Sequence, residues 1–224
     1  MPRGTSTAPR PRPGPVALVG GLVVAQLAFA ATFRGPRAVF WRRMTLTGLV
    51  LGPFAMAVSP GARRAGIGLR EVAAGAVSAA VLYVTFRMGD RLVRVVMPAG
   101  EREIDEIYAL RRLAPPRELT ARLVAIIAPA EELFWRGAVQ AGLMNLLGRW
   151  RGTAAATAAY GGVHLVTGNL TLTAAATVAG AHWAILYALG MPLGALVVSH
   201  ALWDVWIFLV QPTQPFPTDP RDAA

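Results

Sequence analysis

Apolar residues gather in long blocks along this chain, and charged residues fall mainly between the blocks. A helix that crosses a bilayer requires about 20 predominantly apolar residues, because the hydrocarbon core is roughly 30 Å thick. Blocks near that length predict about seven spanning helices (six to eight), at residues 13–33, 44–62, 67–88, 119–147, 153–166, 170–189 and 193–210. The pattern therefore predicts an all-α fold, a polytopic membrane helical bundle.

The region between the third and fourth blocks is charged but not featureless. Ile104, Ile107, Tyr108 and Leu110 recur at helical spacing, which predicts an amphipathic helix lying at the membrane interface. The chain then divides into four parts: an N-terminal tail at 1–12, N-terminal spans with the interfacial helix at 13–117, a helical core at 118–210, and a Pro-rich tail at 211–224 that we expect to be disordered.

The first block is open to two interpretations. An apolar stretch that follows arginines and ends in small residues also fits a secretory signal peptide. Because at least five further blocks follow it, we favour a retained membrane helix.

The composition agrees with a multi-pass membrane protein. The chain is 54% hydrophobic and 15% charged, whereas soluble domains are about 25% charged, and residues 152–203 contain no Asp, Glu, Lys or Arg. The net charge is +10 and every basic residue is Arg; since the arginines fall between apolar blocks, lipid headgroups explain them better than nucleic acid. The Arg-only, Ala-rich composition favours a bacterial cytoplasmic membrane. Cysteine is absent, which excludes disulfides and thiolate chemistry.

Three charged residues interrupt the fourth block, in the stretch AEELFWRG. Each charge at membrane depth costs at least about 2.5 kcal/mol, so such residues face a partner or a water-filled cavity. Glu132 and Arg136 stand four residues apart and are expected to form an ion pair. Glu131 lies about 100° further round the helix and is free to face another element.

All three histidines fall in the uncharged region. His200 and Asp204 stand four residues apart and share one helix face, and His164 follows Tyr160 by one turn. Two imidazoles between carboxylates can position or activate a water molecule, with or without a metal ion. His182, beside a tryptophan, is expected to be a packed or hydrogen-bonded residue rather than a ligand.

Other protease chemistries lack their motifs. The zinc signature HExxH and the nucleophile elbow GxSxG are both absent, and the GxGD motif of intramembrane aspartyl proteases is not matched by RMGD at 87–90. The glutamates and histidines remain as the candidate catalytic set.

In chain order, the motifs EELFWR (131–136), YGGVH (160–164) and HALWD (200–204) resemble those of one family. This is the family of CAAX prenyl endopeptidases and bacteriocin-processing proteins, also called CPBP or Abi intramembrane proteases. The resemblance covers roughly residues 118–210. Each motif is weak alone, whereas the three in order on successive membrane segments are specific.

The resemblance implies roles for six residues. Glu131 would activate water with help from His164, while Glu132 and Arg136 would orient it. His200 and Asp204 would stabilise the oxyanion, or His164, His200 and Asp204 would bind zinc with Glu131 as the base. Asp204 replaces a frequent Asn, and an ionised Asp cannot donate a hydrogen bond to an oxyanion. Both the metal-free reaction and the zinc reaction therefore stay open.

Three function classes follow from the sequence. We favour an intramembrane endopeptidase that hydrolyses a peptide bond near the membrane surface, with a peptide or membrane-protein substrate. The alternatives are a non-proteolytic immunity or scaffold protein that retains the family fold, and a transporter or proton relay. The absence of a sequence repeat disfavours the transporter.

Overall fold

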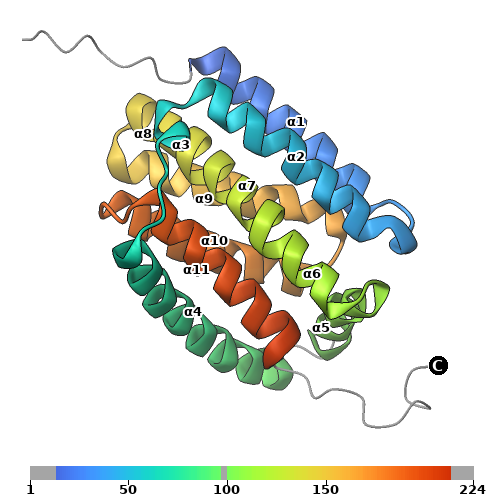
Figure 1. Cartoon of the computed structure of the whole chain (residues 1–224). Helices are drawn as coiled ribbons and strands as arrows, with labels where there is room; N and C mark the ends of the chain where they lie inside the picture. Colours follow the sequence, from blue (N-terminus) through green and yellow to red (C-terminus); the bar gives the residue numbers. More distant parts are fainter. Residues whose placement is uncertain (1–13, 97–99, 213–224) are drawn as a thin grey trace, which may run out of the picture.

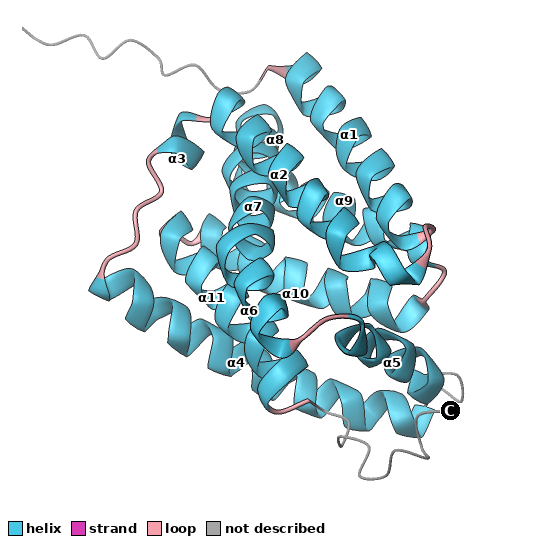
Figure 2. Ribbon diagram, turned by 45° about the vertical axis from the view of Figure 1, so that its right-hand side comes forward, coloured by secondary structure: helices cyan, strands magenta, loops and turns pink. Residues whose placement is uncertain are grey.

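The computed structural model describes residues 14–96 and 100–212, and every regular element in these two ranges is a helix (Figure 2). The all-α prediction is therefore confirmed. The predicted tails, at 1–12 and beyond residue 212, lie outside the described residues.

The first two long helices lie side by side (Figure 1). They are α1 (Pro15–Phe33) and α2 (Phe40–Val58), and Pro53 lies inside α2. The short helix α3 (Pro60–Arg63) follows, capped by the hydroxyl of Ser59. Helices α1 and α2 together form one wall of the bundle.

Helix α4 (Leu69–Val96) is followed by the predicted amphipathic helix α5 (Gly100–Ala109). In α5, Ile104 and Tyr108 are buried while Glu101, Arg102, Asp105 and Glu106 are exposed, so the amphipathic pattern is confirmed. Whether α5 lies at a membrane surface stays a prediction.

A carboxylate fixes α5 to the start of α10 (Leu170–Ala188). The Glu103 Oε2 atom accepts hydrogen bonds from the Thr171 backbone N–H (2.8 Å) and hydroxyl (2.6 Å). These bonds favour the ionised form and hold the pKa of Glu103 below its ordinary value. A negative charge at a helix N-terminus is also favoured by the helix dipole.

The segment that carries the first motif is one continuous helix with two π-helical stretches. Helices α6 (Pro116–Arg122), α7 (Ala128–Glu132) and α8 (Ala141–Leu147) are joined by π-helical turns at Leu123–Ile127 and Leu133–Gln140. Such bulges re-aim the side chains around them and occur often at functional sites. Apolar periodicity does not reveal them.

The last three helices carry the remaining motifs. They are α9 (Arg149–Val163), extended by a 3-10 turn at His164–Thr167, then α10, and finally α11 (Leu193–Val205), extended by a π-helical turn at Trp206–Val210. Gly168 (φ 70°) and Gly190 (φ 101°) adopt the left-handed region at the two reversals, where the sequence predicted the helices to stop.

Helix α7 lies inside the bundle, in contact with both α2 and α11, and α4 packs on the outer side of α11 (Figures 1 and 2). Gly75 of α4 permits that contact, since a Cβ there would lie 2.6 Å from the Ala195 carbonyl oxygen. Gly52 of α2 has a similar role, facing Ala130 of α7. The first motif is therefore enclosed on both sides.

Within the described residues, four helical segments are long and apolar enough to cross a membrane: Pro15–Phe33, Leu69–Val93, Leu170–Ala188 and Leu193–Val210. The other three predicted spans, at 44–62, 119–147 and 153–166, are helical, but none of them is a single helix that is both long and apolar enough. For example, α9 has 15 residues, about 22 Å at 1.5 Å per residue. The predicted count of seven is not confirmed.

Candidate active site

Glu132 connects two of the predicted motifs. Its Oε1 atom accepts a hydrogen bond from Arg136 Nη1 (2.9 Å), one turn along the helix, and contacts His200 Nδ1 of α11 (2.8 Å). The three residues are between 0% and 4% exposed. The predicted Glu132–Arg136 pair is confirmed, whereas its extension to His200 depends on the packing of two distant helices.

His200 lies between two carboxylates. Its Nε2 atom is 3.6 Å from Asp204 Oδ2, which is too long for a hydrogen bond, so Nε2 is not engaged by that carboxylate. The indole of Trp183 stacks on the imidazole with ring centroids 4.1 Å apart. The stacking and the bond to Glu132 together fix the orientation of the ring.

Glu131 faces a different element, as its position on the helix predicted. Its Oε2 atom accepts a hydrogen bond from the hydroxyl of Tyr160 on α9 (3.0 Å). Glu131 lies near enough to His164 and His200 to interact with both electrostatically. One Glu131 oxygen is thus fixed by a phenol, and the other accepts no hydrogen bond from residues 14–96 or 100–212.

His164 is held by its own helix. Its Nδ1 atom is 2.8 Å from the carbonyl oxygen of Tyr160, and because a carbonyl only accepts, Nδ1 carries the proton. Phe29 of α1 packs edge-on against the ring. The Nε2 atom is then the one that can take part in chemistry.

Arg136 is surrounded by acceptors and aromatic rings. Its Nη2 atom donates to the carbonyl oxygen of Gly180 on α10 (3.1 Å), and its guanidinium lies over the rings of Tyr160 (4.8 Å) and Trp183 (5.3 Å). Gly180 allows this approach, since a Cβ at that position would meet Tyr160 Cδ1 at 2.5 Å. Arg136 therefore joins the segments that carry the first two motifs to α10.

The structure brings the six predicted residues into one cluster, in which five are buried and Asp204 is half-buried. Sequence reasoning missed two of its members, Trp183 and Gly180, because α10 carries no charged motif. It also missed Gln140, which is fully buried and donates to the Ala184 carbonyl oxygen (2.8 Å). One feature of the sequence could have indicated Gln140: it is a polar residue one turn beyond Arg136, inside an apolar block.

His182 lies outside the cluster, as predicted. Its Nε2 atom is 2.9 Å from the Ser78 hydroxyl, which also bonds to Ser199 (2.8 Å), and Ser199 accepts from Trp183 Nε1 (3.0 Å). This hydrogen-bond network joins α4, α10 and α11 behind the stacked ring of His200.

The cluster was also tested as a metal site. A zinc site requires at least three protein ligands directed at one point. Within residues 14–96 and 100–212, no group of three His, Asp or Glu side chains has such an arrangement. The predicted ligation by His164, His200 and Asp204 therefore finds no support in this geometry, and we derive no step through a metal.

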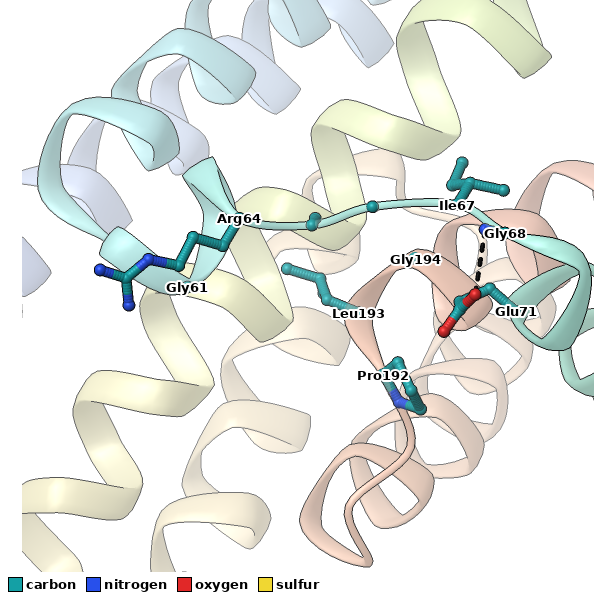
Figure 3. A pocket seen from close by; sticks show the side chains of 10 residues that line it. Gly61, Arg64, Ile67, Gly68, Glu71, Pro192, Leu193 and Gly194 are labelled. Atoms are coloured by element: carbon teal, nitrogen blue, oxygen red, sulfur yellow. Dashed lines mark hydrogen bonds between the residues drawn. The ribbon is translucent and has the colours of Figure 1, made fainter.

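One cavity lies next to the cluster, and another lies away from it. A cavity of about 450 Å³ lies between α4, α5, α10 and α11, and Asp204 is part of its lining. A second cavity of about 520 Å³ lies between the α3–α4 connection and the start of α11, where Glu71 accepts a hydrogen bond from the Gly68 N–H (Figure 3). None of the six predicted residues lines the second cavity.

Comparison with known proteins agrees with the motif analysis. Residues 117–206 match the family described as type II CAAX prenyl endopeptidase Rce1-like. No curated protein and no solved structure matches the chain significantly. The match contains all six residues of the cluster, and the resemblance drawn from the three motifs is confirmed. Residues 117–206 of this chain are a domain of the Rce1-like family of CAAX prenyl endopeptidases.

Proposed function

We propose that this protein is an intramembrane endopeptidase that hydrolyses a peptide bond with a water molecule activated by Glu131. The observation that carries the proposal is the buried cluster itself. Five ionisable side chains, Glu131, Glu132, Arg136, His164 and His200, are each at most 7% exposed, and they come from three separate helical segments. Interhelical hydrogen bonds in membranes average only about 0.6 kcal/mol, so helix packing alone does not account for so many buried ionisable groups.

The first step is proton transfer from water to Glu131. Tyr160 donates to Oε2 and keeps that oxygen in place, which leaves Oε1 to accept the proton. His164 Nε2, the unprotonated ring nitrogen, can accept a second hydrogen bond from the same water and orient it. The water oxygen then forms a bond to the carbonyl carbon of the substrate.

The tetrahedral intermediate carries a negative oxygen that needs a donor. His200 is suited to this role in its imidazolium form: Nδ1–H donates to the Glu132 carboxylate, and Nε2–H, which makes no hydrogen bond to Asp204, is free to donate to the oxyanion. Collapse of the intermediate breaks the C–N bond, and the proton held by Glu131 moves to the leaving amine. Glu131 is thereby regenerated, and one water has been consumed.

The site belongs to a multi-pass membrane protein in this proposal. Four segments are long and apolar enough to span, and the proposed bundle has about seven spans, with α2, α6–α8 and α9 as the additional ones. The expected setting is a bacterial cytoplasmic membrane, and the expected substrate is a peptide or a membrane protein.

The test compares protein termini in cells that produce the wild-type chain or Glu131→Gln. The amide is nearly isosteric with the carboxylate but cannot accept the proton, so new termini should appear only with the wild type. Glu118→Gln is the matched control, since Glu118 is an exposed carboxylate outside the cluster, paired with Arg122. Identical termini in wild type and Glu131→Gln, with both proteins inserted, would contradict a protease and favour a non-proteolytic scaffold.

A further inference from the structure

The cavity that reaches Asp204 is not explained by the hydrolytic cluster alone. Its walls are mostly apolar and come mainly from four helices, including Phe86 and Gly89 of α4, Ile104 and Tyr108 of α5, and Val178 of α10. Asp204, 3.6 Å from His200, is part of its lining. An apolar space that reaches the proposed site is placed to hold the part of a substrate next to the reacting bond.

We infer that this cavity binds an unmodified, apolar peptide segment of the substrate, next to the bond that is cleaved. The inference rests on the proposed function and adds to it the substrate class. It makes the cavity residues, Gly89 above all, determinants of specificity.

The volume fits side chains of a peptide. A cavity of roughly 150 Å³ holds one benzene molecule, so 450 Å³ accommodates two or three large apolar side chains. Burial of each such side chain is favourable because it removes apolar surface from water.

The polar groups favour a peptide over a plain hydrocarbon chain. Asp204 lines the cavity, and its Oδ2 atom is 3.6 Å from His200 Nε2, beyond hydrogen-bonding distance. A peptide supplies backbone N–H groups that can donate to this carboxylate. A hydrocarbon tail offers it no donor.

The cavity wall is also in direct contact with the site through aromatic rings. Phe86 meets Trp203 edge-on (4.8 Å), Trp203 meets Trp183 (5.7 Å), and Trp183 stacks on His200 (4.1 Å). A segment seated against Trp203 would therefore help to hold the ring that positions His200.

Substitution of Gly89 places a new side chain at the lining of the cavity. A Cβ built at Gly89 meets no heavy atom within 4 Å, so a larger side chain there extends into open space without a clash at the backbone. Gly20 of α1 is the matched control: it is also a helical glycine with nothing within 4 Å of its Cβ, and it is exposed and does not line the cavity.

The experiment measures binding separately from hydrolysis. The full chain carrying Glu131→Gln is placed in lipid nanodiscs, and the probe is a fluorescently labelled synthetic peptide of Ala, Leu and Phe, followed by anisotropy. We expect Gly89→Phe to raise Kd by about tenfold or more, since it takes the place of one buried apolar side chain, and Gly20→Phe to leave Kd unchanged. Val178→Trp, from the opposite wall, should act like Gly89→Phe if the latter folds poorly.

Two results would overturn the inference. One is equal peptide affinity in Gly89→Phe, Val178→Trp and the parent chain. The other is tight binding of the same peptide only when it carries a palmitoyl chain, which would assign the cavity to hydrocarbon. Cavity-dependent binding of a peptide that the wild type never hydrolyses would instead contradict the proposed function, and the cavity would then be a peptide-binding site without cleavage.

Discussion

Removal of the Arg136 charge is the sharpest test of how the cluster is held together. Arg136→Met keeps much of the side-chain volume but deletes the guanidinium. Glu132, which is 0% exposed, would then lose its ion-pair partner, and the Gly180 carbonyl oxygen would lose a donor.

The size of the effect follows from the burial. Removing one partner of a buried ion pair destabilises a protein by about 3–5 kcal/mol, because it leaves an uncompensated charge. Lost contacts between the guanidinium and the rings of Tyr160 and Trp183 add to this, at about 0.5–2 kcal/mol each for cation–π pairs. The remaining contact of Glu132 with His200 offsets part of the loss, so we expect about 3–5 kcal/mol in total.

The assay is denaturant unfolding in mixed micelles, followed by tryptophan fluorescence. The double variant Glu132→Gln/Arg136→Met removes both charges and should be more stable than Arg136→Met alone, because no carboxylate is then left unpaired. If Arg136→Met lowers the free energy of unfolding by less than about 1 kcal/mol, or if the double variant is no more stable than the single one, the ion pair does not hold the cluster together.

Three further predictions concern residues around the cluster. Gly180→Ala should lower the free energy of unfolding by about 1–3 kcal/mol, since the added methyl displaces the Tyr160 ring, and a value near zero would contradict that close packing. Glu103→Gln should remove a pH dependence: the pKa of Glu103 is lowered in the folded state, so its bonds to Thr171 stabilise the protein above the unfolded pKa of about 4.3 and are lost as the pH falls through the lower folded pKa. Unfolding measured from pH 6 to pH 3 should show the two proteins converging in acid, and a constant difference would refute the reasoning. Asp204→Asn should keep cleavage within about tenfold of wild type, because Asn supplies a hydrogen-bond donor directly; loss of both activity and bound zinc, measured on the same preparation, would instead favour metal ligation.

The sequence by itself determined the helical class, several of the helix ends and the residues of the candidate site. Periodic apolar blocks, the interfacial pattern around Ile104 and the glycines at 168 and 190 act locally, through helix geometry and backbone freedom, and they could be read without any tertiary contact. The Glu132–Arg136 pair is local too, since residues four apart share a helix face.

Only the tertiary structure decided how these residues meet. Glu132 reaches His200 across 68 positions, and Tyr160 reaches Glu131 across 29, and no spacing rule fixes such distances. Trp183, Gly180 and Gly89 matter because of the helices that pack against them or the space they leave open, and not because of a motif. The π-helical turns around α7 escaped prediction for a related reason: a one-residue bulge changes the direction of side chains without changing the apolar composition from which a helix is predicted.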